Sequence, residues 1–401
     1  MIKSITKVFS SALFAKFILG VVGILLIRFM NAPEFAALTF AVGLATAISQ
    51  VIASSINKIY IIGYDKLNLR ENSFAPLSFQ ALLISIAVLL LLPFSAKLGN
   101  TFIPIISLII GNCFSRFVQT YFQLKRSFGS YAMIEITRAV LILLGFLILL
   151  YWNQYNICAW QVIILQAGVR FFVFVVFMFM NMGLQNIFNL RSGMVIMRVV
   201  LVSNYKYLIG YFSIFAIFAQ VDVFCLRILS DNYNLASYGA AFRYYSLLIL
   251  ALGSVKTVLF PVIKTAKTKT DVEDIYSQYW QLVKYILPLV FLGTLLAGWI
   301  MPLVDAGKYP SSITVFRILS ISAAISFCLS PYSELLHSNE KFSFMFYLMF
   351  ISLILNIGLN IILIVWFGDI GAAIGTTVAF AIANIIIFRK SRSVIAAYRR
   401  E

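Results

Sequence analysis

The chain alternates between long apolar runs and short polar connections from one end to the other. Most runs are about 20 residues long, the length that an α-helix needs to cross the hydrocarbon core of a bilayer. This pattern predicts an all-α integral membrane protein with about twelve transmembrane helices. The predicted segments are 8–29, 34–56, 76–96, 102–122, 131–151, 159–180, 202–228, 234–259, 280–301, 312–333, 342–366 and 370–389.

The basic residues of the connections are consistent with this count. The two ends and every second connection together hold 19 Lys and Arg, whereas the alternate connections hold only Lys97 and Lys308. Short cytoplasmic loops are enriched in Lys and Arg, so the pattern predicts that both termini face the cytoplasm. A missed helix would have scrambled the alternation.

Composition excludes a soluble protein. Of the 401 residues 62% are hydrophobic and only 11% are charged, against about 25% charged in a soluble domain. The net charge of +17 follows from the orientation and from attraction to anionic lipid headgroups, so nucleic acid is not an expected partner. The cysteines are too far apart in sequence to indicate a metal site or a disulfide framework.

Two similar halves are expected. The loop-like stretch 183–201, which ends in a basic and mildly amphipathic piece, is predicted to be a cytoplasmic linker between a lobe at 1–182 and a lobe at 202–390, with a tail at 391–401. Each lobe begins with a helix that ends in Arg, at Arg28 and Arg227, followed by a short polar turn. Two lobes of six helices in the same orientation, around a central cavity, form a transporter architecture. Chance likeness between two outward hairpins is the alternative.

Charged residues deep inside the predicted spans are the candidate site. Such a residue costs about 2.5 to 3.5 kcal/mol to insert and usually faces a wet cavity or a partner. Four deep cations, Lys16, Arg116, Arg138 and Arg170, lie in the first lobe, and Glu135 is the one carboxylate close to them in sequence. We expect a mobile anion to complete this group, and a pyrophosphate suits the planar fork of arginine. The alternative is that each cation binds backbone carbonyls and hydroxyls of neighbouring helices.

In the second lobe Asp222 and Arg243 lie at matching depths on consecutive helices. They predict either a structural ion pair or a coupling site at Asp222 for a cation or proton. Other cations lie near helix ends, where long side chains reach the interface, and these are expected to be anchors: Arg28, Arg227, Lys256, Lys284 and Arg317.

Three stretches of sequence carry a family resemblance. Gln220-Val-Asp222-Val-Phe-Cys-Leu-Arg227, then Leu235-Ala-Ser-Tyr238-Gly239-Ala-Ala-Phe-Arg243, resembles the seventh and eighth helices of polysaccharide flippases. In the first half Arg28 and Ala32-Pro33-Glu34-Phe35 are similar to the outer hairpin of the same proteins, although Ala36 stands where glycine is usual. The chain therefore resembles Wzx-type O-antigen flippases of the MOP (multidrug/oligosaccharidyl-lipid/polysaccharide) superfamily, which share the MATE fold.

The resemblance implies a function as well as a fold. It implies a non-enzymatic flippase that moves an oligosaccharide linked to undecaprenyl pyrophosphate across a bacterial inner membrane by alternating access, for O-antigen, capsule or exopolysaccharide synthesis. It implies no cofactor, H⁺ or Na⁺ as candidate coupling ion, and polysaccharide assembly proteins as candidate partners.

Three other functions are alternatives to this flippase. A drug/cation antiporter of this fold would favour buried carboxylates over buried cations, and a flippase of another lipid-linked glycan, such as teichoic acid or lipid II, would use the same chemistry. A membrane-bound polymerase or glycosyltransferase is disfavoured because all predicted outward loops are short.

Overall fold

The computed structural model describes residues 2–54, 56–57, 75–125, 127–154, 156–181, 205–266 and 268–397. Every regular element in these ranges is a helix. The chain divides into two compact units, Met1–Gln220 and Val221–Glu401. The predicted linker, 183–201, lies outside the described residues.

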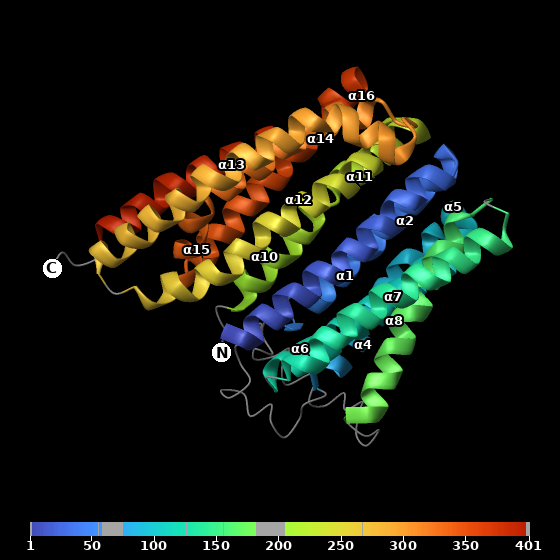
Figure 1. Ribbon diagram of the computed structural model, residues 1–401, viewed down its shortest axis with the longest axis horizontal. Helices are drawn as coiled ribbons and strands as arrows, with labels where there is room; N and C mark the ends of the chain where they lie inside the picture. Colours follow the sequence, from blue (N-terminus) through green and yellow to red (C-terminus); the bar gives the residue numbers. More distant parts are fainter. Residues whose placement is uncertain are drawn as a thin grey trace. The chain divides into compact units, whose positions relative to one another are not determined.

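The first unit is a bundle of long helices in which α6 lies against α8 and α1 lies against α7 (Figure 1). Phe117, Val118, Ile134 and Val173 are among the buried side chains that join α6, α7 and α8. Its helices are α1 (Ile2–Phe29), α2 (Ala32–Ser49), the π-helix η1 (Gln50–Ser54), α4 (Ala75–Leu91), the 3₁₀ helix η2 (Leu92–Phe94), α5 (Ser95–Leu98), the 3₁₀ helix η3 (Gly99–Thr101), α6 (Phe102–Leu124), α7 (Phe128–Trp152), α8 (Ala159–Asn181) and α10 (Tyr205–Phe218).

In the second unit α14 packs against both α12 and α16, and α11 packs against α16. Val272, Tyr279, Ala323 and Phe327 belong to its core. Its helices are α11 (Val221–Leu229), α12 (Asn232–Thr265), α13 (Lys269–Asp305), α14 (Ser311–Cys328), α15 (Ser330–Ser338) and α16 (Phe342–Ala396).

The helices confirm the predicted fold class. Seven described helices are long and apolar enough to cross a membrane, and an eighth span results if α10 and α11 are taken together. Twelve spans are compatible with this result. Two of the seven run through 48 and 55 residues, more than twice the ~20 residues that one span needs, and α1 and α12, with 28 and 34 residues, are also long enough. In α16 the chain breaks at Gly368, where φ is 56°, between the last two predicted segments.

Helix α13 begins earlier than predicted. The apolar pattern starts the span at 280, but the helix starts at Lys269, one residue after the N-cap Thr268. Thr268 Oγ1 accepts a hydrogen bond from Asp271 N at 3.1 Å, and Thr268 N donates to Asp271 Oδ2 at 3.0 Å. This reciprocal capping box satisfies backbone groups that would otherwise end the helix, so charged residues expected in a loop form its first turns.

Both units close their first hairpin in the same way. The Asn31 side chain accepts a hydrogen bond from Glu34 N at 3.0 Å, and the Asp231 side chain accepts one from Asn234 N at 2.7 Å. Each residue is an N-cap in extended conformation, a position where Asn and Asp are favoured because they satisfy a free backbone N–H. The likeness between Arg28–Glu34 and Arg227–Asn234 in the sequence therefore corresponds to a shared local structure.

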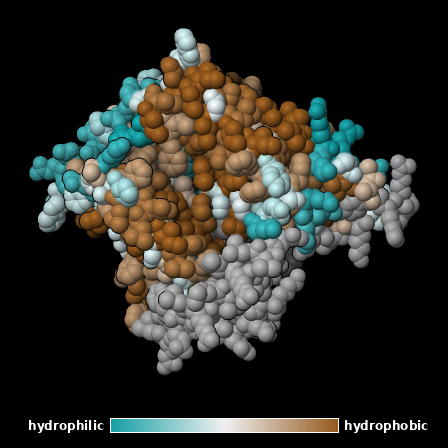
Figure 2. Space-filling model, turned by 180° about the vertical axis from the view of Figure 1, so that it is seen from behind, coloured by the Kyte–Doolittle hydropathy of each residue, from teal (hydrophilic) through white to brown (hydrophobic). Residues whose placement is uncertain are grey.

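The surface is that of a membrane protein. Large apolar side chains are exposed along α4, α7, α13 and α16, among them Leu90, Ile148, Phe291 and Trp366. Figure 2 shows hydrophobic residues over most of the described surface on one face, with hydrophilic residues toward its edges. Soluble proteins rarely expose so much contiguous apolar surface to water, so the chain is a multi-pass membrane protein.

Candidate functional site

Four helices of the first unit bring the five predicted charged residues together. Lys16 lies near the middle of α1, Arg116 on α6, Glu135 and Arg138 on α7, and Arg170 on α8. Lys16, Arg116 and Arg170 each lie close enough to Glu135 and Arg138 to interact with them electrostatically. We call these five side chains the cation cluster.

An ion pair on α7 anchors the cluster. Arg138 Nη2 lies 2.6 Å from Glu135 Oε2, as their spacing of three residues predicts. Gln119 on α6 donates a hydrogen bond to the other oxygen of Glu135. Glu135 is buried, and its two oxygens are therefore held by one cation of the cluster and one neutral amide.

Arg170 lies at the contact between α6 and α8. Its Nη1 donates to the Gln166 carbonyl at 2.9 Å, one turn earlier on α8. Gly111 faces it on α6, where a Cβ would stand 3.3 Å from the Arg170 Cβ and 3.2 Å from the Ala167 carbonyl. The absence of a side chain at Gly111 thus permits the close approach of the two helices that places Arg170 beside Arg116 and Arg138.

The cluster carries more positive than negative charge. Four cations and one carboxylate give the five side chains a net charge of +3. Two buried polar atoms on the same helices, Arg138 Nε and Ser115 Oγ, have no hydrogen-bond partner among the described residues. Lys16 is exposed and Arg116, Arg138 and Arg170 are half-buried, so an anion could reach them. Guanidinium groups bind phosphate oxygens with two parallel hydrogen bonds.

The second unit holds a buried carboxylate at Asp222. It is 5% exposed and lies in the first turn of α11. Its Oδ1 accepts hydrogen bonds from Asn360 Nδ2 at 2.8 Å and from Asn356 Nδ2 at 3.3 Å. Its Oδ2 accepts hydrogen bonds from Thr376 Oγ1 at 2.5 Å and from the Tyr238 hydroxyl. All four donors are uncharged.

Neutral side chains donate the hydrogen bonds to Asp222, and its pairing with Arg243 stays a prediction. Helix α11 lies against α16, which presents two asparagines and a threonine to Asp222. Arg243 lies half-buried farther along α12, five residues after Tyr238.

The Asp222 group offers oxygen atoms that suit a hard monovalent cation. It contains one carboxylate, the threonine hydroxyl and two carboxamides, and the Asn360 Oδ1 is buried with no hydrogen-bond partner among the described residues. A rotation of either carboxamide would replace its donor with an oxygen facing the same space. No group of three His, Cys, Asp or Glu side chains able to hold a metal occurs in the described ranges.

Sequence reasoning missed Gln119, Asn356, Asn360 and Thr376. A signal for two of them exists, since Asn356 and Asn360 are one helical turn apart in an otherwise apolar run. Polar side chains inside a membrane span tend to face protein rather than lipid.

The sequence is similar to one glycan flippase over part of its length. No known family profile matches the sequence. The probable low-salt glycan biosynthesis flippase Agl15 of Haloferax volcanii is 25% identical over 181 residues, which are 44% of this chain and 37% of that protein. The match thus spans little more than a third of that relative.

Among solved structures, the lipid II flippase MurJ in an inward closed conformation matches with a TM-score of 0.77 at 15% identity, over 96% of this chain and 87% of MurJ. An inward-facing multidrug resistance transporter of the MATE family, a member of the MOP superfamily, matches with a TM-score of 0.65 at 16% identity, over 99% of this chain and 94% of the transporter. These similar proteins are flippases and transporters, and the chain has the fold that they share.

Proposed function

We propose that the protein is a flippase that moves an oligosaccharide linked to undecaprenyl pyrophosphate from the cytoplasmic to the periplasmic leaflet of a bacterial inner membrane. The cation cluster is the observation that carries the proposal. Its net charge of +3 lies near the middle of membrane-spanning helices, where inserting an ionised side chain costs free energy. The diphosphate supplies compensating charge, and Lys16, Arg116, Arg138 and Arg170 bind it.

The chemistry favours an anionic substrate over a cationic drug. A drug/cation antiporter would need a carboxylate open to its substrate, but Glu135 is occupied by Arg138 and Gln119. Asp222 is buried with four hydrogen bonds, three of them from α16 at distances of 2.5 to 3.3 Å and one from Tyr238 of α12. The likeness to glycan flippases in sequence and in fold supports the same substrate class.

The membrane potential is strong enough to drive this export. Moving about two negative charges outward across roughly 150 mV, inside negative, releases on the order of 7 kcal/mol, at about 2.3 kcal/mol per charge per 100 mV. This release shrinks if the cation cluster moves with the substrate. A coupling cation at Asp222 would then supply the driving force. Thr376 Oγ1 lies beside the carboxylate, and rotation of the Asn356 and Asn360 carboxamides, whose nitrogens now face Asp222, would add their oxygens to the shell of the cation.

The orientation completes the proposal. Both termini face the cytoplasm, and the glycan enters O-antigen, capsule or exopolysaccharide synthesis together with the proteins that assemble the polymer. Two lobes, 1–182 and 202–390, alternate access to the site across the linker at 183–201.

Deletion of the gene in its native host tests the function. We expect lipid-linked repeat units to accumulate on the cytoplasmic side while their synthesis continues, and surface polysaccharide to fall. Reintroduction of the parent protein should restore the polymer. Unchanged surface polysaccharide in the deletion strain would refute the flippase function.

A further inference from the structure

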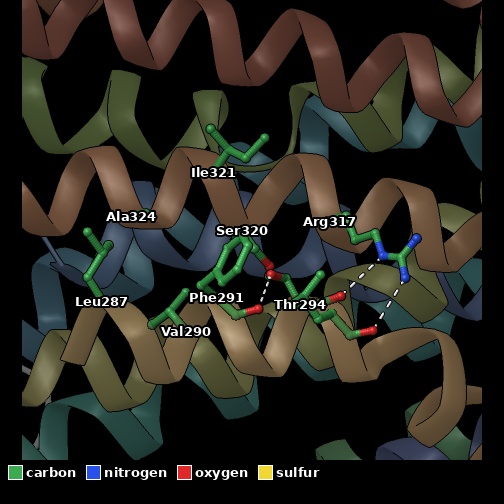
Figure 3. Close-up of a pocket in the computed structure, with 9 residues that line it drawn as sticks. Leu287, Val290, Phe291, Thr294, Arg317, Ser320, Ile321 and Ala324 are labelled. Carbon is green, nitrogen blue, oxygen red and sulfur yellow. Dashed lines mark hydrogen bonds between the residues drawn. The ribbon is translucent and has the colours of Figure 1, made fainter. Parts of the chain in front are cut away.

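A groove opens between α13 and α14 in the second unit. Its volume is about 530 Å³, within the range of about 300 to 1,000 Å³ that small-molecule sites occupy. Figure 3 shows Leu287, Val290 and Phe291 on one wall and Ile321 and Ala324 on the other. The cation cluster and the Asp222 group belong to other helices.

The groove walls suit a hydrocarbon chain. The two hydroxyl residues in the lining bond to their own helices: Thr294 Oγ1 donates to the Phe291 carbonyl at 2.7 Å and Ser320 Oγ donates to the Phe316 carbonyl at 2.7 Å. Neither hydroxyl proton is therefore offered to a ligand. A sugar or a polar drug would lose its hydrogen bonds with water there and gain few in return.

One end of the groove carries a fixed positive charge. Arg317 Nε donates to the Thr294 carbonyl at 3.1 Å, and Nη2 donates to the Leu295 carbonyl at 3.4 Å (Figure 3). Gly298 leaves room for this position, because a Cβ there would stand 3.1 Å from Nη2, a close contact. The guanidinium is exposed, and its remaining N–H groups have no partner among the described residues.

The depth of the groove matches the orientation of a lipid. Arg317 is six residues from the start of α14 at Ser311, about 9 Å along the axis, and Ala324 is about 10 Å deeper. The charged end thus lies toward the membrane surface that Lys308 faces, and the apolar end lies toward the bilayer centre. Phospholipids carry their phosphate and acyl chains in this order.

We propose that the α13–α14 groove is a binding site for an anionic phospholipid. One acyl chain lies between Leu287, Phe291 and Ala324, and the phosphate binds the guanidinium of Arg317. A guanidinium is a donor only and matches phosphate oxygens. Charge complementarity selects a headgroup with net negative charge, since the phosphate of a zwitterionic headgroup already has its own ammonium as counter-ion. The groove holds about 10 Å of chain, which fits part of an acyl chain better than a long polyprenyl tail.

Native mass spectrometry of the purified full chain tests the site, with phosphatidylglycerol, phosphatidylethanolamine and undecaprenyl phosphate as added lipids. Arg317→Gln should weaken phosphatidylglycerol binding about tenfold, the loss expected for a charge-assisted hydrogen bond. It should weaken phosphatidylethanolamine binding less, because the phosphate of that lipid keeps its own ammonium as counter-ion. Ala324→Phe, which fills the apolar end, should weaken both phospholipids. Ser320→Leu serves the same purpose if Ala324→Phe fails to fold.

Arg227→Gln is the matched control, since Arg227 is an exposed arginine near the end of another helix in the same unit, bonded to Asn232 at 2.7 Å. It should leave phosphatidylglycerol binding within twofold of the parent. Equal losses in Arg227→Gln and Arg317→Gln, or parent-like binding in Arg317→Gln, would overturn the proposal. Tighter binding of undecaprenyl phosphate than of phosphatidylglycerol at this groove would also overturn it.

Discussion

The Glu135–Arg138 pair permits a quantitative test of the cation cluster. The two side chains are 9% and 15% exposed and lie 2.6 Å apart. Removing one member of a buried pair costs about 3 to 5 kcal/mol, because the other charge remains buried without compensation. Arg138→Gln removes the ion pair and leaves the Gln119 amide as a hydrogen-bond donor to Glu135, while the charges of Lys16, Arg116 and Arg170 still act on the carboxylate. We therefore expect its loss of unfolding free energy to lie near the lower end of that range.

The double variant separates stability from anion binding. Glu135→Gln with Arg138→Gln removes both charges, and its unfolding free energy should return to within about 1 kcal/mol of the parent, since replacing both members of a buried pair is often neutral. The cluster keeps a net charge of +3 in the double variant. Arg170→Gln lowers that charge to +2, so pyrophosphate should stabilise it less than the double variant.

The assay is equilibrium unfolding in mixed micelles, with and without inorganic pyrophosphate. All three variants are compared with the parent at one ionic strength, because screening weakens the effect of exposed Lys16. The reasoning is refuted if Arg138→Gln unfolds like the parent, if the double variant is no more stable than Arg138→Gln, or if pyrophosphate stabilises Arg170→Gln as much as the parent.

Three further predictions concern other parts of the chain. Sodium chloride should raise the unfolding free energy of the parent relative to choline chloride, by up to about 2.7 kcal/mol at a sodium concentration of one hundred times Kd. Asp222→Asn should abolish the difference, and an equal sodium effect in the variant would exclude a cation at Asp222. Glu34→Ala should lower stability by about 1 kcal/mol, because Glu34 Oε2 accepts a hydrogen bond from Ala159 N at 2.6 Å and thereby caps α8; a midpoint equal to that of the parent would contradict this. Gly368→Ala should lower the unfolding free energy by about 1 kcal/mol or more, since φ is 56° and a Cβ would stand 2.7 Å from Asn234 Oδ1. Gly358→Ala is the control: nothing lies within 4 Å of a Cβ at Gly358, so this variant should not destabilise the helix.

The sequence predicts the helices well because apolar length is a strong local signal. Segments such as 102–122 and 159–180 differ from α6 (Phe102–Leu124) and α8 (Ala159–Asn181) by a few residues. Where the prediction fails, as at Lys269, a polar capping box extends the helix beyond the apolar run. Such an extension depends on side-chain hydrogen bonds, which a hydropathy pattern does not report.

The candidate site is predictable in part. Insertion cost singles out Lys16, Arg116, Arg138 and Arg170 from the sequence, and the structure brings them together. The surroundings of Asp222 were not predictable, because they depend on which helix packs against α11. Sequence order suggests Arg243 on the next helix as the partner, whereas three of the four hydrogen bonds to Asp222 come from Asn356, Asn360 and Thr376 of α16 and the fourth comes from Tyr238 of α12.

Transport by the purified protein in proteoliposomes tests the role of the cation cluster most directly. The measurement is the rate at which an oligosaccharide linked to undecaprenyl pyrophosphate crosses the bilayer under an imposed potential. We predict that the parent accelerates this transfer and that Lys16→Ala and Arg170→Ala, reconstituted in equal amounts, each reduce it at least about tenfold, as the loss of a charge-assisted phosphate contact implies. Transfer at the parent rate by both variants would contradict the account.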